Sequence, residues 1–235
     1  MSVSSSRIEI PTPDGRMPAY AAAPDTGRHP AVVVLVEAFG LVGNIERVAE
    51  RIAAEGYVAI APDLYYRLLP EKSAFGYDDM EGAIGAMSRL DDESFVSDMQ
   101  AALDYLDSRE DTTDRVGVTG FCMGGRLSFL SACALPGRIA CSAPFYGGGI
   151  VAHLDAASAI RCPLYLFFGE KDDYIPLDQV EQIGARLGEL GIGHDLKVYP
   201  GADHGFFCDE RDSYHESAAA DSWSELKSFL RAHLG

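Results

Sequence analysis

A cysteine stands at the centre of a glycine-rich corner, in the segment GFCMGG at residues 120–125. An apolar stretch at 115–120 leads into this corner, and a helix-like pattern leaves it. A strand that turns directly into a helix through Gly-x-nucleophile-x-Gly presents the central side chain at the tip of a strained turn. The N-terminus of a helix also favours a thiolate. We therefore expect Cys122 to be a nucleophile; the alternative is a buried, inert cysteine.

The other cysteines have no comparable setting. The chain has five cysteines, with no Cys-x-x-Cys pair and no Cys/His cluster at zinc spacing. An odd number without such pairs indicates a reducing compartment rather than a disulfide framework. We assign the remaining four to packing: Cys133, Cys141, Cys162 and Cys208.

A cysteine nucleophile needs a base, and the base needs an acid that orients it. Asp172 follows the predicted strand 164–168, and His204 follows the predicted strand 194–199. In α/β proteins that carry a hydrolytic triad on the loops after their strands, the three residues follow one another along the chain in the order nucleophile, acid, base, as they do here. Asp173 is the rival for the acid, and we prefer Asp172 because it lies in the first turn past its strand. The alternative for His204 is a solvated loop histidine.

Attack on an ester carbonyl produces an oxyanion, which two backbone N–H groups can stabilise. The residue after the nucleophile, Met123, and the loop after the first long strand, at Ala38, are the expected donors. Glu37 closes the hydrophobic strand 31–36 beside Ala38. A carboxylate at the end of a buried strand needs a function or a partner, so we expect Glu37 to face the active-site cleft that Cys122 also faces. A buried salt bridge is the alternative, to Arg126 or Arg47.

Strands and helices alternate along the chain. Apolar or alternating segments predict strands at 7–10, 17–23, 31–37, 57–62, 115–120, 139–148, 163–169 and 194–200. Amphipathic spacing predicts a helix after Asn44, its expected N-cap, that Gly56 closes, and further helices around 95–106, 180–190 and 223–230.

This alternation predicts a single α/β domain over 1–235, with a mainly parallel central sheet and helices on both faces. Ligands of such sheets bind at the carboxyl ends of the strands. The segment from 63 to 92 reads as loops with one short helix, and long connections of this kind usually cover a site.

The charge balance restricts the partners. Nineteen Lys and Arg stand against 36 Asp and Glu, giving a net charge of −17. Such a chain repels phosphate backbones and anionic lipid surfaces, so neither nucleic acid nor membrane is expected. The N-terminus lacks the apolar core of a signal peptide, which favours the cytoplasm. We expect a small-molecule lactone or ester as substrate, no metal or organic cofactor, and a monomer.

Five motifs, in order, resemble the dienelactone hydrolase family: EAFG at 37–40, APDLYYR at 61–67, GFCMGG at 120–125, GEKDDYIP at 169–176 and ADHGF at 202–206. The resemblance covers about residues 30 to 210. It implies the α/β-hydrolase fold and a Cys–His–Asp triad on Cys122, His204 and Asp172. It also implies that Glu37 interacts with the thiol of Cys122 and helps to deprotonate it when substrate enters.

The chain departs from the family in one respect. The best-studied members hold a substrate carboxylate with two arginines, whereas this chain has Cys208 at one of these positions and no arginine in 76–84. Other cations could replace them: Arg67, Lys72, Arg89 or Arg211. The sequence thus predicts a hydrolase that opens a lactone or an activated ester through a thioester. Two alternatives stay open, a general carboxylesterase or thioesterase for uncharged substrates and a non-hydrolytic thiol sensor.

Overall fold

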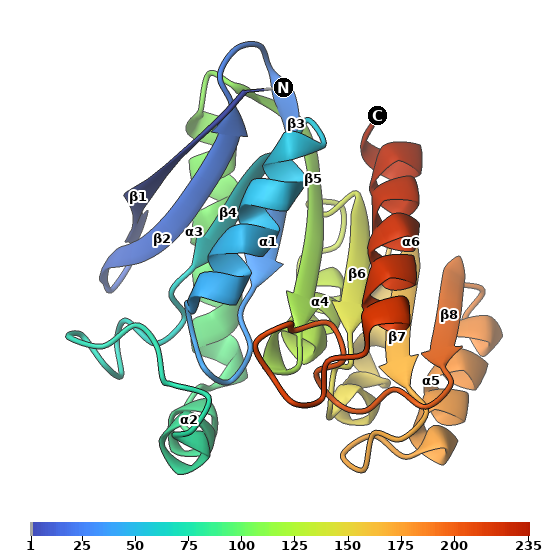
Figure 1. Ribbon diagram of the computed structural model, residues 1–235. Coiled ribbons are helices and arrows are strands. Elements are labelled where there is room, and N and C mark those ends of the chain that lie inside the picture. The colour runs from blue at the N-terminus through green and yellow to red at the C-terminus, as the bar shows by residue number, and fades with distance from the viewer. Residues whose placement is uncertain (1) are drawn as a thin grey trace. The chain divides into compact units, whose positions relative to one another are not determined.

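The computed structural model describes residues 2–235 (Figure 1). Contacts within the chain cluster into two units, one ending at Val116 and the other beginning at Gly117. The boundary falls inside β5 (Thr112–Phe121). Each unit contains strands that pair with one another and helices that cover them, and each is described in turn. The single domain expected over 1–235 stays a prediction.

The first unit begins with a hairpin that contains the predicted strands at 7–10 and 17–23. Strands β1 (Val3–Thr12) and β2 (Gly15–Pro24) are antiparallel, and β2 pairs in the same way with β4 (Val58–Pro62). Strand β4 then pairs in parallel with β3 (His29–Leu35), which gives the order β1-β2-β4-β3. The continuous apolar runs of β3 and β4 are buried, as strands covered on both faces should be.

Helices lie on both faces of this first sheet. Figure 1 shows α1 (Gly43–Ala54) in front of the strands and α3 (Asp92–Ser108) behind them. The apolar residues three and four positions apart that predicted these helices are also the residues on their buried faces. The buried apolar side chains include Ile45, Val48 and Ile52 of α1, and Phe95, Met99, Ala102, Leu103 and Leu106 of α3.

The start of α1 differs from the prediction. Its N-cap is Val42, with an extended backbone, and the helix begins at Gly43. Asn44 therefore lies inside the first turn, where it is buried, and its assignment as the N-cap is wrong. The backbone closes the turn without a capping side chain, because Ile45 N–H donates to the carbonyl of Val42. The predicted end is confirmed: Gly56 follows the helix with a φ of +103°.

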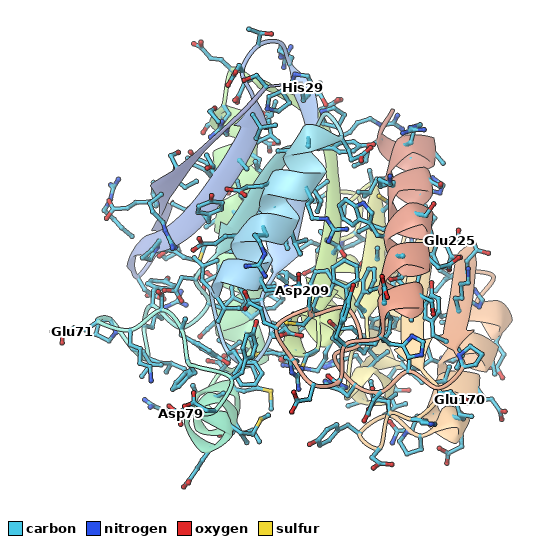
Figure 2. The ribbon with its side chains drawn as sticks, in the orientation of Figure 1. His29, Glu71, Asp79, Glu170, Asp209 and Glu225 are labelled. Carbon is cyan, nitrogen blue, oxygen red and sulfur yellow. The ribbon has the colours of Figure 1, made fainter. Side chains whose placement is uncertain are left out.

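The connection from 63 to 92 holds one short helix, as predicted. This helix, α2 (Met80–Met87), begins at Asp79, whose carboxylate accepts a hydrogen bond from the N–H of Gly82 at 3.0 Å (Figure 2). Two exposed apolar side chains, Met80 and Ile84, stand one turn apart on α2.

Asp63, at the end of β4, is a buried carboxyl group with an altered pKa. Burial raises its pKa to about 6, and the hydrogen bond from Tyr65 N–H at 3.0 Å together with the charge of Arg7 opposes the rise only in part. The folded state therefore holds the proton more tightly than the unfolded state. The stabilisation from this group is present below about pH 4 and is lost as the pH rises through about 6.

We expect Asp63→Asn to remove this loss, because the amide does not ionise and its oxygen can still accept from Tyr65. The free energy of unfolding of the variant minus that of the unchanged chain should be about 2 kcal/mol larger at pH 7.5 than at pH 4, so the variant gains relative stability as the pH rises. Urea unfolding at the two pH values measures this difference. An identical effect of the substitution at both values would contradict the assignment.

The second unit is a parallel sheet. Strands β5, β6 (Cys141–Phe145), β7 (Leu164–Gly169) and β8 (His194–Tyr199) pair in chain order, each parallel to the next. Figure 1 shows α6 (Glu216–Leu234) on one face and α4 (Met123–Ala134) with α5 (Leu177–Glu189) on the other. Two 3₁₀ turns, Ile150–His153 and Ala156–Ala159, connect β6 to β7. Parallel pairs predominate in the chain, as predicted.

Aromatic side chains fill the core of the second unit below the carboxyl ends of its strands. The rings of Phe121 and Phe145 are 4.8 Å apart between centroids, and those of Phe145 and Phe167 are 4.3 Å apart. On the edge strand, Lys197 pairs at 2.8 Å with Glu225 of α6 (Figure 2). None of the helices within residues 2–235 combines the length and the apolar character that crossing a bilayer requires.

Candidate active site

Cys122 occupies the turn between β5 and α4, where the sequence placed it. Its φ of 55° and ψ of −114° are unusual for a residue with a side chain, and among the described non-glycine residues only Tyr146 shares a positive φ. The N–H of Cys122 donates to the carbonyl of Phe145 at 3.1 Å, which ties the turn to the neighbouring strand. Backbone strain of this kind persists where the surrounding structure imposes it, as it does here.

The glycine after the turn is required by close packing. A Cβ atom on Gly125 would lie 2.3 Å from the carbonyl oxygen of Phe145 and 2.9 Å from backbone atoms of Gly147. Gly147 in turn leaves no space, since its own Cβ would lie 2.7 Å from the backbone nitrogen of Arg126. The first turn of α4 and the end of β6 therefore approach each other through two glycines. This contact fixes the position of Cys122.

Gly125→Ala is expected to displace the turn, because the added methyl group meets backbone that cannot rotate away. We expect a loss of about 1–3 kcal/mol in the free energy of unfolding and a fall of about 100-fold in kcat/KM for an activated ester. Gly188→Ala is the matched control, since a Cβ there meets open space on α5. Urea unfolding and ester kinetics measure both variants, and a Gly125→Ala protein with unchanged kinetics would show that the contact is dispensable.

The five cysteines differ in their exposure to solvent. Cys122 is partly exposed, whereas the four that the sequence assigned to packing are all buried. Burial raises the pKa of Cys133 to about 12 and that of Cys162 to about 11, so neither forms a thiolate at neutral pH. Cys122 is thus the most accessible of the five thiols.

The loops after β7 and β8 are joined by hydrogen bonds. Lys171 N–H donates to the carbonyl of Ala202 at 2.8 Å, and Gly201 N–H donates to the carboxylate of Glu170, which lies in the loop after β7, also at 2.8 Å (Figure 2). Gly169 permits this approach, because a Cβ there would lie 2.5 Å from the carbonyl oxygen of Ala202. The pairing brings two loops about thirty residues apart in the chain into fixed register.

Asp172 and His204 meet in these joined loops. The Nδ1 of His204 donates to Oδ2 of Asp172 at 2.7 Å. The other carboxylate oxygen accepts from the N–H groups of Tyr174 at 2.9 Å and Ile175 at 3.2 Å. Asp172 is 3% exposed, whereas Asp173 is exposed to solvent. The structure therefore brings Asp172, and not its rival Asp173, to the imidazole.

His204 also contacts the cysteine. Its imidazole, 8% exposed, hydrogen-bonds with the Cys122 thiol in addition to Asp172. Since Nδ1 is bonded to Asp172, the ring nitrogen left to interact with Cys122 is Nε2. Burial disfavours the charged imidazolium, but the bonds to Asp172 and then to Cys122 outweigh it and raise the pKa of His204 to about 10. The environment thus stabilises an imidazolium beside the sulfur.

Two tyrosines that the sequence analysis did not identify flank His204. Tyr146, which is buried and has a φ of 34°, packs against the imidazole with ring centroids 5.2 Å apart. Tyr174, which is 70% exposed, packs against it at 5.1 Å. Tyr146 directly follows β6, so its place at the carboxyl end of a parallel strand was the signal that could have found it. Tyr174 had no such signal beyond its nearness to Asp172.

The remaining predicted residues lie next to the expected elements. Met123 is the first residue of α4, directly after Cys122, at the end of the helix where N–H groups lack an intrahelical acceptor. In the first unit, β3 ends at Leu35, earlier than predicted, and Glu37 and Ala38 follow it as buried residues. Gly40 N–H donates to the Glu37 carbonyl at 2.9 Å, which fixes the peptide that carries Ala38 N–H. The roles of these three residues toward substrate and Cys122 stay predictions.

Two of the cations considered for a substrate carboxylate have partners of their own. Arg67 donates to Asp98 at 2.7 Å and to Asp14 at 2.9 Å, and Asp98 is fully buried. Lys72 lies 3.9 Å from the centroid of the Phe75 ring and 3.4 Å from the carboxylate of Asp79. The two carboxylates neutralise Arg67, so its proposed use for a substrate carboxylate is not supported.

The second unit contains another of the cations considered for a substrate carboxylate, Arg211. The guanidinium of Arg211 lies against the backbone of Gly205, the residue after His204, where a Cβ would be 2.3 Å from it. Within residues 2–235 no three His, Cys, Asp or Glu side chains form a group that could hold a metal ion.

Comparisons with known proteins agree on one group of relatives. The model of the "Dienelactone hydrolase family" matches residues 17–234. A protein of Synechocystis sp. named "Putative carboxymethylenebutenolidase" is 35% identical over 246 residues, covering 100% of this chain and 99% of the relative. A protein of Yersinia pestis with the same name is 30% identical and covers 95% of this chain and 86% of its own length. The crystal structure of a "Putative Dienelactone Hydrolase" from Klebsiella pneumoniae superposes with a TM-score of 0.89, at 30% identity, covering 98% and 99% of the two chains.

Proposed function

The chain belongs to the dienelactone hydrolase family, with its α/β-hydrolase fold, and we propose that it hydrolyses lactones or activated carboxylic esters through Cys122, His204 and Asp172. The observation that supports this reaction is the hydrogen-bonded series from Asp172 through His204 to Cys122 in the second unit. A thiol, an imidazole and a carboxylate in this order are the parts that nucleophilic acyl transfer needs.

In the first half of the reaction, the thiolate of Cys122 attacks the carbonyl carbon and forms a carbon–sulfur bond. The N–H groups of Met123 and Ala38 stabilise the resulting oxyanion, each contributing roughly 3 kcal/mol to lowering the barrier. The carbon–oxygen bond of the ester then breaks, and the departing oxygen takes the proton from Nε2 of His204. The products of this half are a thioester on Cys122 and a neutral alcohol, or a tethered enol when the substrate is a lactone.

In the second half, water hydrolyses the thioester. His204, now neutral, accepts a proton from the water as its oxygen attacks the acyl carbon, and the sulfur leaves as a thiolate paired with the imidazolium. The bond from His204 Nδ1 to Asp172 holds the imidazole in the tautomer that both halves require. Glu37 assists the first deprotonation of Cys122, a role that rests on the resemblance to the family.

A thiolate is a good leaving group, so a cysteine nucleophile suits esters whose own leaving group is stabilised, such as an enolate or a phenolate. The net charge of −17 and the two carboxylates on Arg67 favour an uncharged substrate. A general carboxylesterase or thioesterase activity on uncharged substrates is therefore the second candidate. Enol lactones with and without a carboxylate, compared by kcat/KM, distinguish the two candidates.

Mass spectrometry of the intact protein tests the covalent step. After brief incubation with p-nitrophenyl acetate and acid quenching, we expect a mass increase of one acetyl group, located on the peptide that contains Cys122. The thiol sensor remains as an alternative of another class. A sensor would give no acetyl adduct and would show only sulfenic acid on Cys122 after peroxide treatment, and that result would overturn the proposal.

A further inference from the structure

Tyr174 is an exposed aromatic ring that contacts the base. It is 70% exposed, yet its ring centroid lies 5.1 Å from that of His204, with the two ring planes at 69°. The other aromatic neighbour of the imidazole, Tyr146, is only 1% exposed. The imidazole thus has one aromatic neighbour in the core and one on the solvent side.

The backbone of Tyr174 is held while its ring stays open to solvent. Its N–H donates to Asp172 at 2.9 Å, and the next residue, Ile175, is buried and donates to the same carboxylate oxygen. The ring therefore has a fixed point of attachment beside the Asp172–His204 pair. An aromatic surface held in place in this way loses little conformational entropy when a ligand packs on it.

The chemistry of the reaction decides which part of the substrate reaches this ring. The departing oxygen must come within about 2.6–3.2 Å of Nε2 of His204 to receive its proton. The atoms attached to that oxygen then lie beside the imidazole, where Tyr174 packs. The acyl group, by contrast, is bonded to the sulfur of Cys122 and to the oxyanion, so Tyr174 is expected to contact the alcohol side of the ester.

We infer that Tyr174 is a specificity-determining residue that selects esters and lactones whose leaving alcohol is planar and unsaturated, such as a phenol or an enol. This inference rests on the proposed function. Stacking between the exposed ring and a planar leaving group stabilises the transition state for such substrates, whereas a saturated alcohol gains little from the same surface.

Four esters test the inference by varying the two sides of the substrate separately: phenyl acetate, phenyl benzoate, 2,2,2-trifluoroethyl acetate and 2,2,2-trifluoroethyl benzoate. For each ester, the ratio of kcat/KM between variant and unchanged chain cancels the intrinsic reactivity of the substrate. Tyr174→Ala is expected to lower kcat/KM about 5- to 10-fold for both phenyl esters and less than about two-fold for both trifluoroethyl esters.

Three further variants separate the ring from other effects. Tyr174→Phe is expected to restore the values for the phenyl esters to within about two-fold of the unchanged chain, because it keeps the ring. Tyr174→Leu keeps an apolar side chain without a ring, and we expect it to lower kcat/KM for the phenyl esters as much as Tyr174→Ala does. Tyr214→Ala removes another tyrosine of the second unit, 41% exposed, and is expected to change none of the four values.

The outcomes are distinct from those of the proposed function. An equal fall for all four esters would overturn the inference, since it would show that Tyr174 only supports Asp172. A fall that follows the benzoyl group, or no change at all, would overturn it as well. Cys122→Ala, assayed on the same four esters, reports on the proposed function independently: its failure to abolish turnover would reject the nucleophile, whatever Tyr174 does.

Discussion

Cys122→Ala is expected to lower kcat/KM for phenyl acetate by about 10,000-fold or more, with the fold intact. The substitution removes the sulfur that attacks the carbonyl and leaves water, activated by His204, as the attacking group. What remains is the stabilisation of the oxyanion, which acts on a much slower attack by water. Initial rates over a range of substrate concentrations measure the effect, and circular dichroism with urea unfolding checks the fold.

Cys133→Ala is the matched control for this prediction. Cys133 lies on the same helix, α4, but is buried and has a pKa raised to about 12, so it contributes no thiolate. We expect this variant to lose stability through the small cavity it creates while keeping its activity. Activity in Cys122→Ala comparable to that of the control would show that another group performs the attack.

Asp172→Asn is expected to lower kcat/KM by at least about 100-fold. Asp172 accepts the hydrogen bond from Nδ1 of His204 at 2.7 Å, and an amide can donate there instead and so favour the other tautomer. The variant also loses the negative charge that helps to raise the pKa of His204 to about 10. The imidazolium should then lose its proton at lower pH, and the alkaline limb of the pH–rate profile should move to lower pH.

Asp173→Asn provides the control, because it makes the same chemical change one residue further along the same loop. Asp173 is exposed and takes no part in the contact with the imidazole that Asp172 makes. We expect kcat/KM within about two-fold of the unchanged chain and an unmoved alkaline limb. If the two variants behaved alike, the bond between Asp172 and His204 would not orient the base.

The sequence predicted the features that depend on local chemistry. The buried strands follow from continuous apolar runs, and α3 follows from apolar side chains at spacings of three and four. The corner at Cys122 was recognisable because only glycines fit where a strand turns at once into a helix, and Gly125 meets backbone atoms at 2.3 Å in the structure. The end of α1 at Gly56 also follows from a property of one residue, its tolerance of a positive φ.

Local sequence could not decide between neighbours of the same type. Asp172 and Asp173 are chemically identical and adjacent, and the choice between them depends on how the loops after β7 and β8 pair at Lys171 and Ala202. In the same way, Asn44 has the side chain of an N-cap, but α1 begins two residues earlier than that assignment requires, so Val42 takes the position.

The tertiary structure alone decided which charged and aromatic side chains are available to a substrate. Arg67 looked free in the sequence, yet Asp98, 31 residues away, is buried against it and neutralises it. No sequence pattern marked Tyr174, and the role proposed for it rests on a packing contact with His204, 30 positions further along the chain. Hydrophobic pattern and turn chemistry determine where elements begin and end, whereas ion pairs and ring contacts between distant residues exist only once the strands have aligned the loops that carry them.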